Sequence, residues 1–145
     1  MSASLGRAFA SPVKSCGLDE IRGAVSWTTQ GMAFDHHWMV VDEKSGRMVT
    51  QKSDPWMVLI AQRFRGGEVL LLCAPGMDED CVIPLWPPVA EMKTRKVKLY
   101  KEDDAKYTVM DAGDAPARWL SAFFSQHGRT RPVRLVMRLP ETQRR

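Results

Sequence analysis

Short apolar runs separated by turn residues fill most of the chain, a pattern typical of β-sheet proteins rather than of alternating strands and helices. Residues 37–51 contain an apolar run, a polar turn and a return, which predicts a β-hairpin. In 91–110, apolar and charged side chains alternate with period two and predict another hairpin, with one solvated face. A further hairpin is expected where a glycine pair, 66–67, separates apolar runs at 58–60 and 69–73.

One stretch has the period of an amphipathic helix. Its apolar face consists of Trp119, Leu120, Phe123 and Phe124. We expect Asp114 to cap its N-terminus and Gly128 to end it, which predicts a helix from Asp114 to His127. An alternating strand at 132–137 follows. The predicted fold is therefore mainly β (α+β), a small antiparallel β-barrel with one α-helix in the C-terminal half.

The length of 145 residues fits one domain, which we expect at 8–138 between a lead-in at 1–7 and a tail at 139–145. The three cysteines are odd in number and form no CxxC pair, which argues against a disulfide framework and a zinc knuckle. No apolar run approaches the roughly 20 residues of a membrane-spanning helix. We expect a cytoplasmic protein without a membrane partner.

No constellation of residues predicts an active site. Asp35, His36 and His37 are adjacent, but neighbouring histidines on a strand point to opposite faces, so we predict no metal site there. Cys16 follows Lys14 in a turn, and a nearby ammonium group can activate a thiol, but no base accompanies it at a recognisable spacing. A nucleophilic Cys16 is therefore the third of our functional hypotheses.

The positive charge is clustered. The net charge is +4, with basic side chains concentrated in 93–101 and in 129–145. The first cluster is typical either of a nucleic-acid interface on a small barrel or of a charged outer face that protects an edge strand from aggregation. We favour the charged face, because three acidic residues directly follow the cluster, and rank nucleic-acid binding second.

Several segments, taken in order, resemble one known family. They are Pro12-Val-Lys-Ser-Cys16, the stretch from Gly31 to Asp42, Gly46-Arg-Met-Val-Thr-Gln51, and Trp119-Leu120 followed by Pro132-Val-Arg-Leu-Val136. Together they resemble the N-terminal β-barrel domain of the MOSC (molybdenum cofactor sulfurase C-terminal) proteins, over residues 8–138. The relatives include the mitochondrial amidoxime-reducing component.

The resemblance implies a role in cofactor binding. In that family the barrel precedes a catalytic domain whose cysteine ligates molybdenum, and it helps to hold the phosphate of the molybdopterin-type cofactor. Lys14 and Ser15 match two of the phosphate-binding positions, and His36 stands where the family has an arginine. The chain ends soon after Pro140, where the catalytic domain would begin. We therefore expect a stand-alone accessory module, not an enzyme on its own, that binds a phosphorylated small molecule or docks on a separate catalytic protein.

Overall fold

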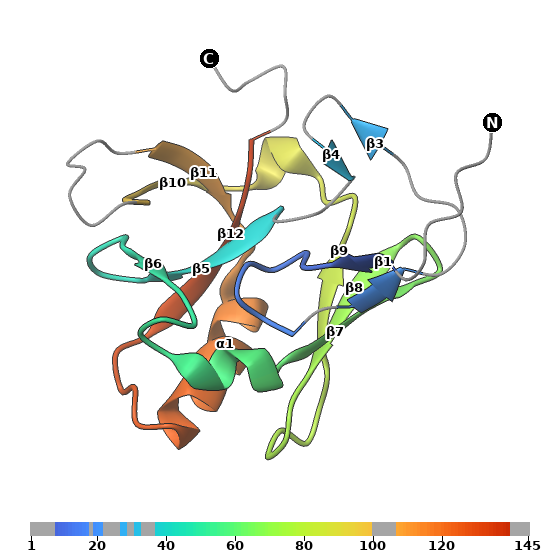
Figure 1. Ribbon diagram of the computed structural model, residues 1–145. Coiled ribbons are helices and arrows are strands. Elements are labelled where there is room, and N and C mark those ends of the chain that lie inside the picture. The colour runs from blue at the N-terminus through green and yellow to red at the C-terminus, as the bar shows by residue number, and fades with distance from the viewer. Residues whose placement is uncertain are drawn as a thin grey trace.

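The computed structural model describes residues 8–17, 19–21, 27–28, 31–32, 37–99 and 107–139 (Figure 1). Near the N-terminus, β1 (Ala8–Ala10) pairs with β2 (Asp19–Ile21), and β3 (Trp27–Thr28) pairs with β4 (Gly31–Met32), both antiparallel. No helix in these described segments is long and apolar enough to cross a membrane.

The largest sheet has five antiparallel strands in the order β10-β11-β12-β5-β6. Its members are β5 (Trp38–Asp42), β6 (Met48–Val49), β10 (Thr94–Val97), β11 (Tyr107–Asp111) and β12 (Val133–Met137). The hairpins predicted in 37–51 and 91–110 are thus confirmed. The strand predicted at 132–137 is also present, and it lies at the centre of the sheet, between β11 and β5.

The two outer strands of this sheet meet. Residues 47 and 98 form a parallel bridge, in which the Met48 amide donates to the Lys98 carbonyl at 3.0 Å and the Lys98 amide donates to the Gly46 carbonyl at 2.8 Å. A Cβ on Gly46, whose φ is +72°, would come within 2.8 Å of the Lys96 carbonyl, so the contact depends on glycine. The sheet therefore closes on itself as a small barrel, as predicted.

A second sheet contains β7 (Ala61–Arg65), β8 (Val69–Cys73) and β9 (Cys81–Pro84), all antiparallel. Gly66 and Gly67 join β7 to β8 with φ of +60° and +67°, the left-handed conformations that a tight hairpin turn requires. The glycine pair therefore predicted this hairpin correctly.

One prediction about the start of that hairpin is wrong. Residues 58–60 do not form a strand, because the chain makes a 3₁₀ helix, η1 (Pro55–Leu59), before β7 begins at Ala61. Pro55 has the fixed φ that favours a helical start, and Met57 and Ile60, three residues apart, are both buried. A second 3₁₀ turn, η2 (Val89–Glu91), follows β9.

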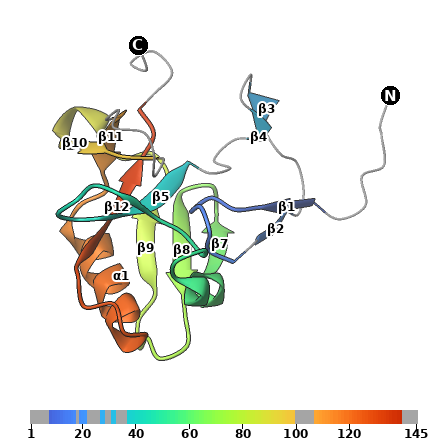
Figure 2. The same cartoon turned by 60° about the vertical axis from the view of Figure 1, so that its left-hand side comes forward.

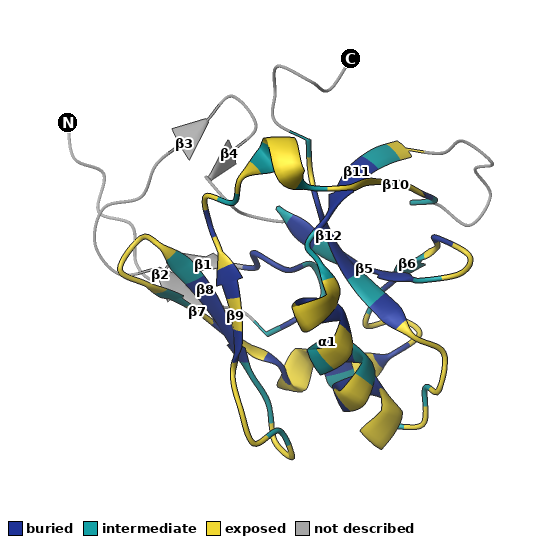
Figure 3. Cartoon of the chain, turned by 180° about the vertical axis from the view of Figure 1, so that it is seen from behind, coloured by how far each residue is buried: buried dark blue, intermediate teal, exposed yellow. Residues whose placement is uncertain are grey.

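The helix α1 (Asp114–Gln126) packs against β12 and β9, beneath the barrel in Figure 2. Leu120, Phe123 and Phe124 are fully buried, and Figure 3 shows buried and exposed residues on opposite sides of the helix. The predicted cap is wrong by one residue: Gly113, with φ of +98°, precedes the helix, and Asp114 is its first residue. Gly128 ends the helix region with φ of +94°, as expected.

The barrel strands separate two apolar clusters. Side chains on the outer face, among them Val40, Leu135 and Met110, join the main core with α1 and the second sheet. The alternate positions point into the barrel. They form a smaller cluster of Val41, Val97, Val109 and Val136, with Met39 and Leu99 packed against it. The barrel thus has its own apolar centre, and its two ends differ in chemistry.

Candidate functional site: the two ends of the barrel

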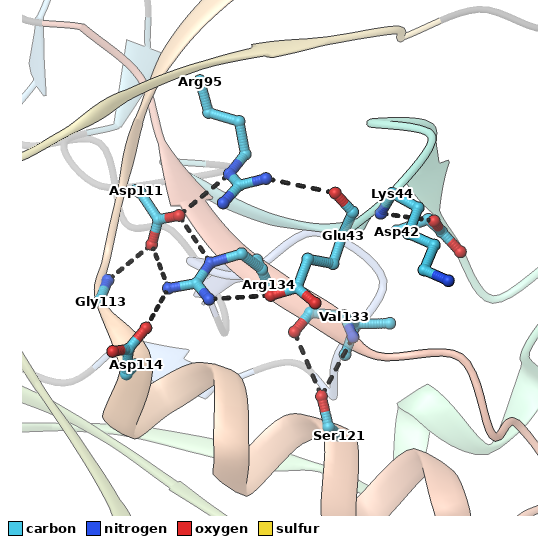
Figure 4. A network of polar contacts seen from close by, with 10 residues as sticks. All are labelled: Asp42, Glu43, Lys44, Arg95, Asp111, Gly113, Asp114, Ser121, Val133 and Arg134. Atoms are coloured by element: carbon cyan, nitrogen blue, oxygen red, sulfur yellow. Dashed lines mark hydrogen bonds and ion pairs between the residues drawn. The ribbon is translucent and has the colours of Figure 1, made fainter.

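One end of the barrel is closed by charged side chains (Figure 4). Arg134, on β12, donates to both oxygens of Asp111 on β11, at 2.6 and 3.0 Å. Arg95, on β10, donates to Asp111 at 3.0 Å and to the Glu43 carbonyl at 3.2 Å. Arg134 also reaches the carboxylates of Glu43 and Asp114. This network connects four segments that are distant in sequence.

The network is largely withdrawn from solvent. The side chains of Arg134 and Asp111 are only 11% and 7% exposed. Burial alone would raise the pKa of Asp111, but hydrogen bonds from Arg134, the Gly113 amide and Arg95 outweigh it and lower the pKa below its usual value. Asp111 is therefore a carboxylate at neutral pH, and its position indicates a structural closure of the barrel.

The same geometry bears on the nucleic-acid hypothesis. Four arginines of the two basic segments pair with carboxylates: Arg95, Arg129, Arg131 and Arg134. Lys96 donates to the Thr108 hydroxyl across the β10–β11 pair. Phosphate-backbone binding relies on exposed cations, and these contacts neutralise several of them within the fold. Nucleic-acid binding by the basic strand stays a prediction of second rank.

The opposite end of the barrel lies at the start of β5, beside the turn formed by 11–17. Val13 forms a parallel bridge with Trp38, in which the Lys14 amide donates to the Trp38 carbonyl at 2.9 Å and the Trp38 amide donates to the Pro12 carbonyl at 3.0 Å. Gly17 approaches the chain at Ile60 so closely that a Cβ on it would lie 3.0 Å from the Ile60 carbonyl. The turn is thus fixed at both of its ends.

Gln62, on β7, fixes the 11–17 turn through hydrogen bonds to its backbone. It is 3% exposed, and its carboxamide oxygen accepts a hydrogen bond from the Val13 amide at 2.7 Å. Its NH₂ group donates to the carbonyls of Val13 and Gly17. The sequence did not single out Gln62, although a polar residue at an inward position of an alternating strand is a signal for such a role.

Ser15 stands at the apex of this turn in an uncommon conformation. Its φ of +72° is left-handed, which costs energy for a residue with a Cβ and is often found at functional positions. Neither the amide nor the hydroxyl of Ser15 has a hydrogen-bond partner within the described parts of the chain. The ammonium group of Lys14 likewise makes no ion pair with any described residue.

A pocket of about 220 Å³ opens at this end of the barrel. Its apolar wall includes Met39, Met48, Leu99, Val109 and Val136, and its charged or titratable side chains are Lys14, His37 and Arg138. Each titratable side chain that the described part of the chain contributes to this lining is basic. The pocket therefore combines an apolar wall with basic side chains.

The structure brings some of the predicted site residues together and not others. Lys14 lines the pocket, whereas Ser15 lies next to it in the turn but outside the lining. His36 lies outside the described residues. The sequence did not assign Arg138 or the apolar wall to a site, although Arg138 directly follows β12 and continues the alternation of Arg134 and Val136, which share the inward face.

Cys16 is not suited to nucleophilic catalysis. Its side chain is 4% exposed, and burial raises the pKa of the thiol to about 12. At neutral pH the reactive thiolate is therefore scarce. Burial also raises the pKa of Cys81 to about 12. Among the described residues, no group of three or more histidine, cysteine or carboxylate side chains is arranged to hold a metal ion.

A five-stranded antiparallel sheet curved into a barrel, with one covering helix, defines the chain as a small, mainly β barrel domain. The model of the family described as "MOSC N-terminal beta barrel domain" matches residues 2–127, and the chain belongs to that family. The family resemblance predicted from the sequence is confirmed.

Known proteins agree with this assignment. The chain is 34% identical over 128 residues to mitochondrial amidoxime-reducing component 1 of Xenopus laevis, covering 86% of this chain and 34% of the relative. It is 32% identical over 122 residues to a molybdenum cofactor sulfurase of Drosophila mojavensis, covering 81% of this chain and 15% of the relative. The chain thus spans about a third or less of the length of these relatives.

A solved structure shares the fold. The solution structure of a Bordetella bronchiseptica protein superposes with a TM-score of 0.67 at 21% sequence identity, covering 92% of this chain and 89% of that one. This likeness supports the architecture described above.

Proposed function

We propose that this domain is a binding module that holds the phosphate group of a small molecule at the Lys14–Ser15 turn. The observation that carries the proposal is the set of donors at the turn. An ammonium group, a hydroxyl and a backbone amide are adjacent and have no partners among the described residues, while Gln62 fixes the backbone that presents them. Such donors suit the oxygens of a phosphate, which accept several hydrogen bonds at once.

A molybdopterin-type cofactor is the ligand that the family favours, since its named relatives include a molybdenum cofactor sulfurase. The turn fits the phosphate end of such a cofactor, which Lys14 and Ser15 would hold. Bound molybdenum would supply the redox chemistry, but we assign no metal ligand to this chain. The thiols of Cys16 and Cys81 are buried, with their pKa raised to about 12.

Docking on a separate catalytic protein is the second candidate function. It is favoured by two exposed apolar side chains at the outer strand of the second sheet, Val82 on β9 at 56% exposure and Trp86 just beyond it at 72%. Exposed apolar side chains of this size are a common feature of protein contacts. The two functions are compatible, because β9 belongs to the second sheet and the Lys14–Ser15 turn lies at the barrel.

The variant Lys14→Ala tests the phosphate site. A hydrogen bond to a charged group contributes about 1.5–3 kcal/mol, so the dissociation constant for a phosphorylated pterin should rise by about tenfold or more. Lys52→Ala removes an equal charge from an exposed turn and should change the constant less than twofold. Isothermal titration calorimetry of the three proteins at one salt concentration makes the comparison. Equal losses in both variants would mean that only the overall charge matters.

A further inference from the structure

We propose that the pocket at the barrel end receives the body of the ligand and that, among the phosphorylated molecules that the Lys14–Ser15 turn can hold, it favours those with a compact apolar body over a polar pterin ring. The inference rests on the proposed phosphate site, because Lys14 belongs both to the turn and to the pocket lining. It narrows the ligand class by the chemistry of the pocket wall, which the phosphate site alone does not define.

The wall is apolar because of strand register. Met39 on β5 stands opposite Val136 on β12, and Met48 on β6 stands opposite Val41, so these side chains all point into the barrel. Val109 and Leu99 complete the wall from the other side. A wall of this kind gains free energy from burying hydrocarbon and has few groups to satisfy a polar ring.

The pocket has a definite depth. Below the wall, the apolar centre of the barrel is filled by Val41 and Val97, which are fully buried. Beyond that centre, the Arg134–Asp111 network closes the far end. A ligand therefore enters and leaves by the end that carries Lys14, and its charged group stays at that opening.

The size of the pocket limits the body. An apolar cavity of about 150 Å³ in a protein core holds a benzene molecule, and this pocket is larger, at about 220 Å³. One aromatic ring or a short aliphatic chain therefore fits. Methionine side chains such as those of Met39 and Met48 are flexible and polarisable, which lets the pocket adapt to bodies of somewhat different shape.

The opening selects for negative charge. Among the described residues of the lining, Lys14, His37 and Arg138 are the titratable ones, and none of them is a carboxylate. An anion at the opening gains from this basic surround, whereas a cation is repelled. A neutral, apolar body attached to a phosphate therefore matches both the apolar wall and the basic opening of the pocket.

Phenyl phosphate is a direct probe of this ligand class. The wild-type protein is isotope-labelled at its methionine methyl groups. It is then titrated separately with phenyl phosphate, inorganic phosphate and benzyl alcohol, and binding is followed by NMR. We expect phenyl phosphate to bind at least tenfold more tightly than inorganic phosphate, equivalent to about 1.4 kcal/mol, and to shift the methyl signals of Met39 and Met48.

A pocket-filling variant provides the matched comparison. Met48→Trp places an indole in the wall and should remove the advantage of phenyl phosphate while inorganic phosphate still binds. Ala122→Trp places the same indole on the exposed side of α1, away from the pocket, and should leave both affinities unchanged within twofold. Thermal unfolding of both variants shows whether each is folded.

The outcomes separate the two proposals. Equal affinities for the two phosphates, with shifts confined to the Lys14–Ser15 turn, would overturn the pocket assignment and leave the proposed phosphate function intact. Binding of benzyl alcohol alone would overturn the proposed ligand class, since the phosphate would then contribute nothing. The absence of binding by either phosphate would refute the phosphate site itself, and the inference with it.

Discussion

Replacing Arg134 by methionine is expected to lower the free energy of unfolding by about 3 kcal/mol, because the change leaves the buried Asp111 without its main partner. Methionine keeps the length and apolar packing of the side chain, so the loss reports the ion pairs and hydrogen bonds. Arg95 still donates to Asp111, which places the effect at the lower end of the usual range for a broken buried pair. Urea denaturation at neutral pH measures it.

Arg131→Met is the matched control for this variant. Arg131 also pairs with a carboxylate, that of Asp42, but its side chain is 61% exposed. Exposed ion pairs contribute about 0–1 kcal/mol, so the control should lose less than Arg134→Met by a clear margin. Similar small losses in both variants would contradict a stabilising role for the barrel closure.

The loss of stability at acid pH is an independent test of the Arg134–Asp111 network. The pKa of Asp111 is lowered in the folded state, so its contribution is complete above the unfolded carboxylate pKa of about 3.9 and is lost as pH falls through the folded pKa. The wild-type protein should therefore lose stability below about pH 4. Arg134→Met should show a shallower loss over the same range, because it has less of that contribution to lose.

Replacing Gln62 by methionine should also cost about 3 kcal/mol, since it leaves the Val13 amide and the Gly17 carbonyl without the carboxamide that they bond. The same variant should bind a phosphorylated pterin more weakly, because the backbone that presents Lys14 and Ser15 loses its support. Gln62 would then be a positioning residue that does not itself touch the ligand. Chemical denaturation and calorimetry measure the two effects on one protein.

Gln51→Met serves as the control, because Gln51 is exposed on a turn. A surface change of this kind usually alters stability by less than about 0.5 kcal/mol, and phosphate affinity should not change. A Gln62→Met protein with reduced stability but normal affinity would show that the turn keeps its shape without the carboxamide. That result would mean that Gln62 does not position the phosphate-binding turn.

Local sequence patterns predicted the elements of this fold better than their arrangement. Turn chemistry identified the hairpin at Gly66 and Gly67, and helical periodicity identified α1, because both signals arise from neighbouring residues. The central position of β12 depends on pairings with distant strands, which no local pattern encodes. The run at 58–60 was misassigned because a short apolar run fits a strand and a buried 3₁₀ turn equally well.

The candidate site, like the fold, was predictable from the sequence only in part. Lys14 and Ser15 came from the family resemblance, and their conformation was not predictable, since a left-handed serine is rare. Gln62 lies 49 residues from Val13 along the chain, so its hydrogen bonds to the turn appear only in three dimensions. The pocket likewise arises from the closure of the barrel, which brings Met48 on β6 and Leu99 beyond β10 to one opening.

The most direct test of the central claim is a two-dimensional amide NMR titration of the wild-type protein with a phosphorylated pterin, with inorganic phosphate as the reference. Saturable shifts should centre on Lys14 and Ser15 and extend to His37 and Trp38 at the start of β5, and they should be lost in Lys14→Ala. Amides of the distant β7–β8 turn should not move. An unchanged spectrum up to millimolar ligand, or shifts centred on the basic residues of β10, would contradict a phosphate site at this turn.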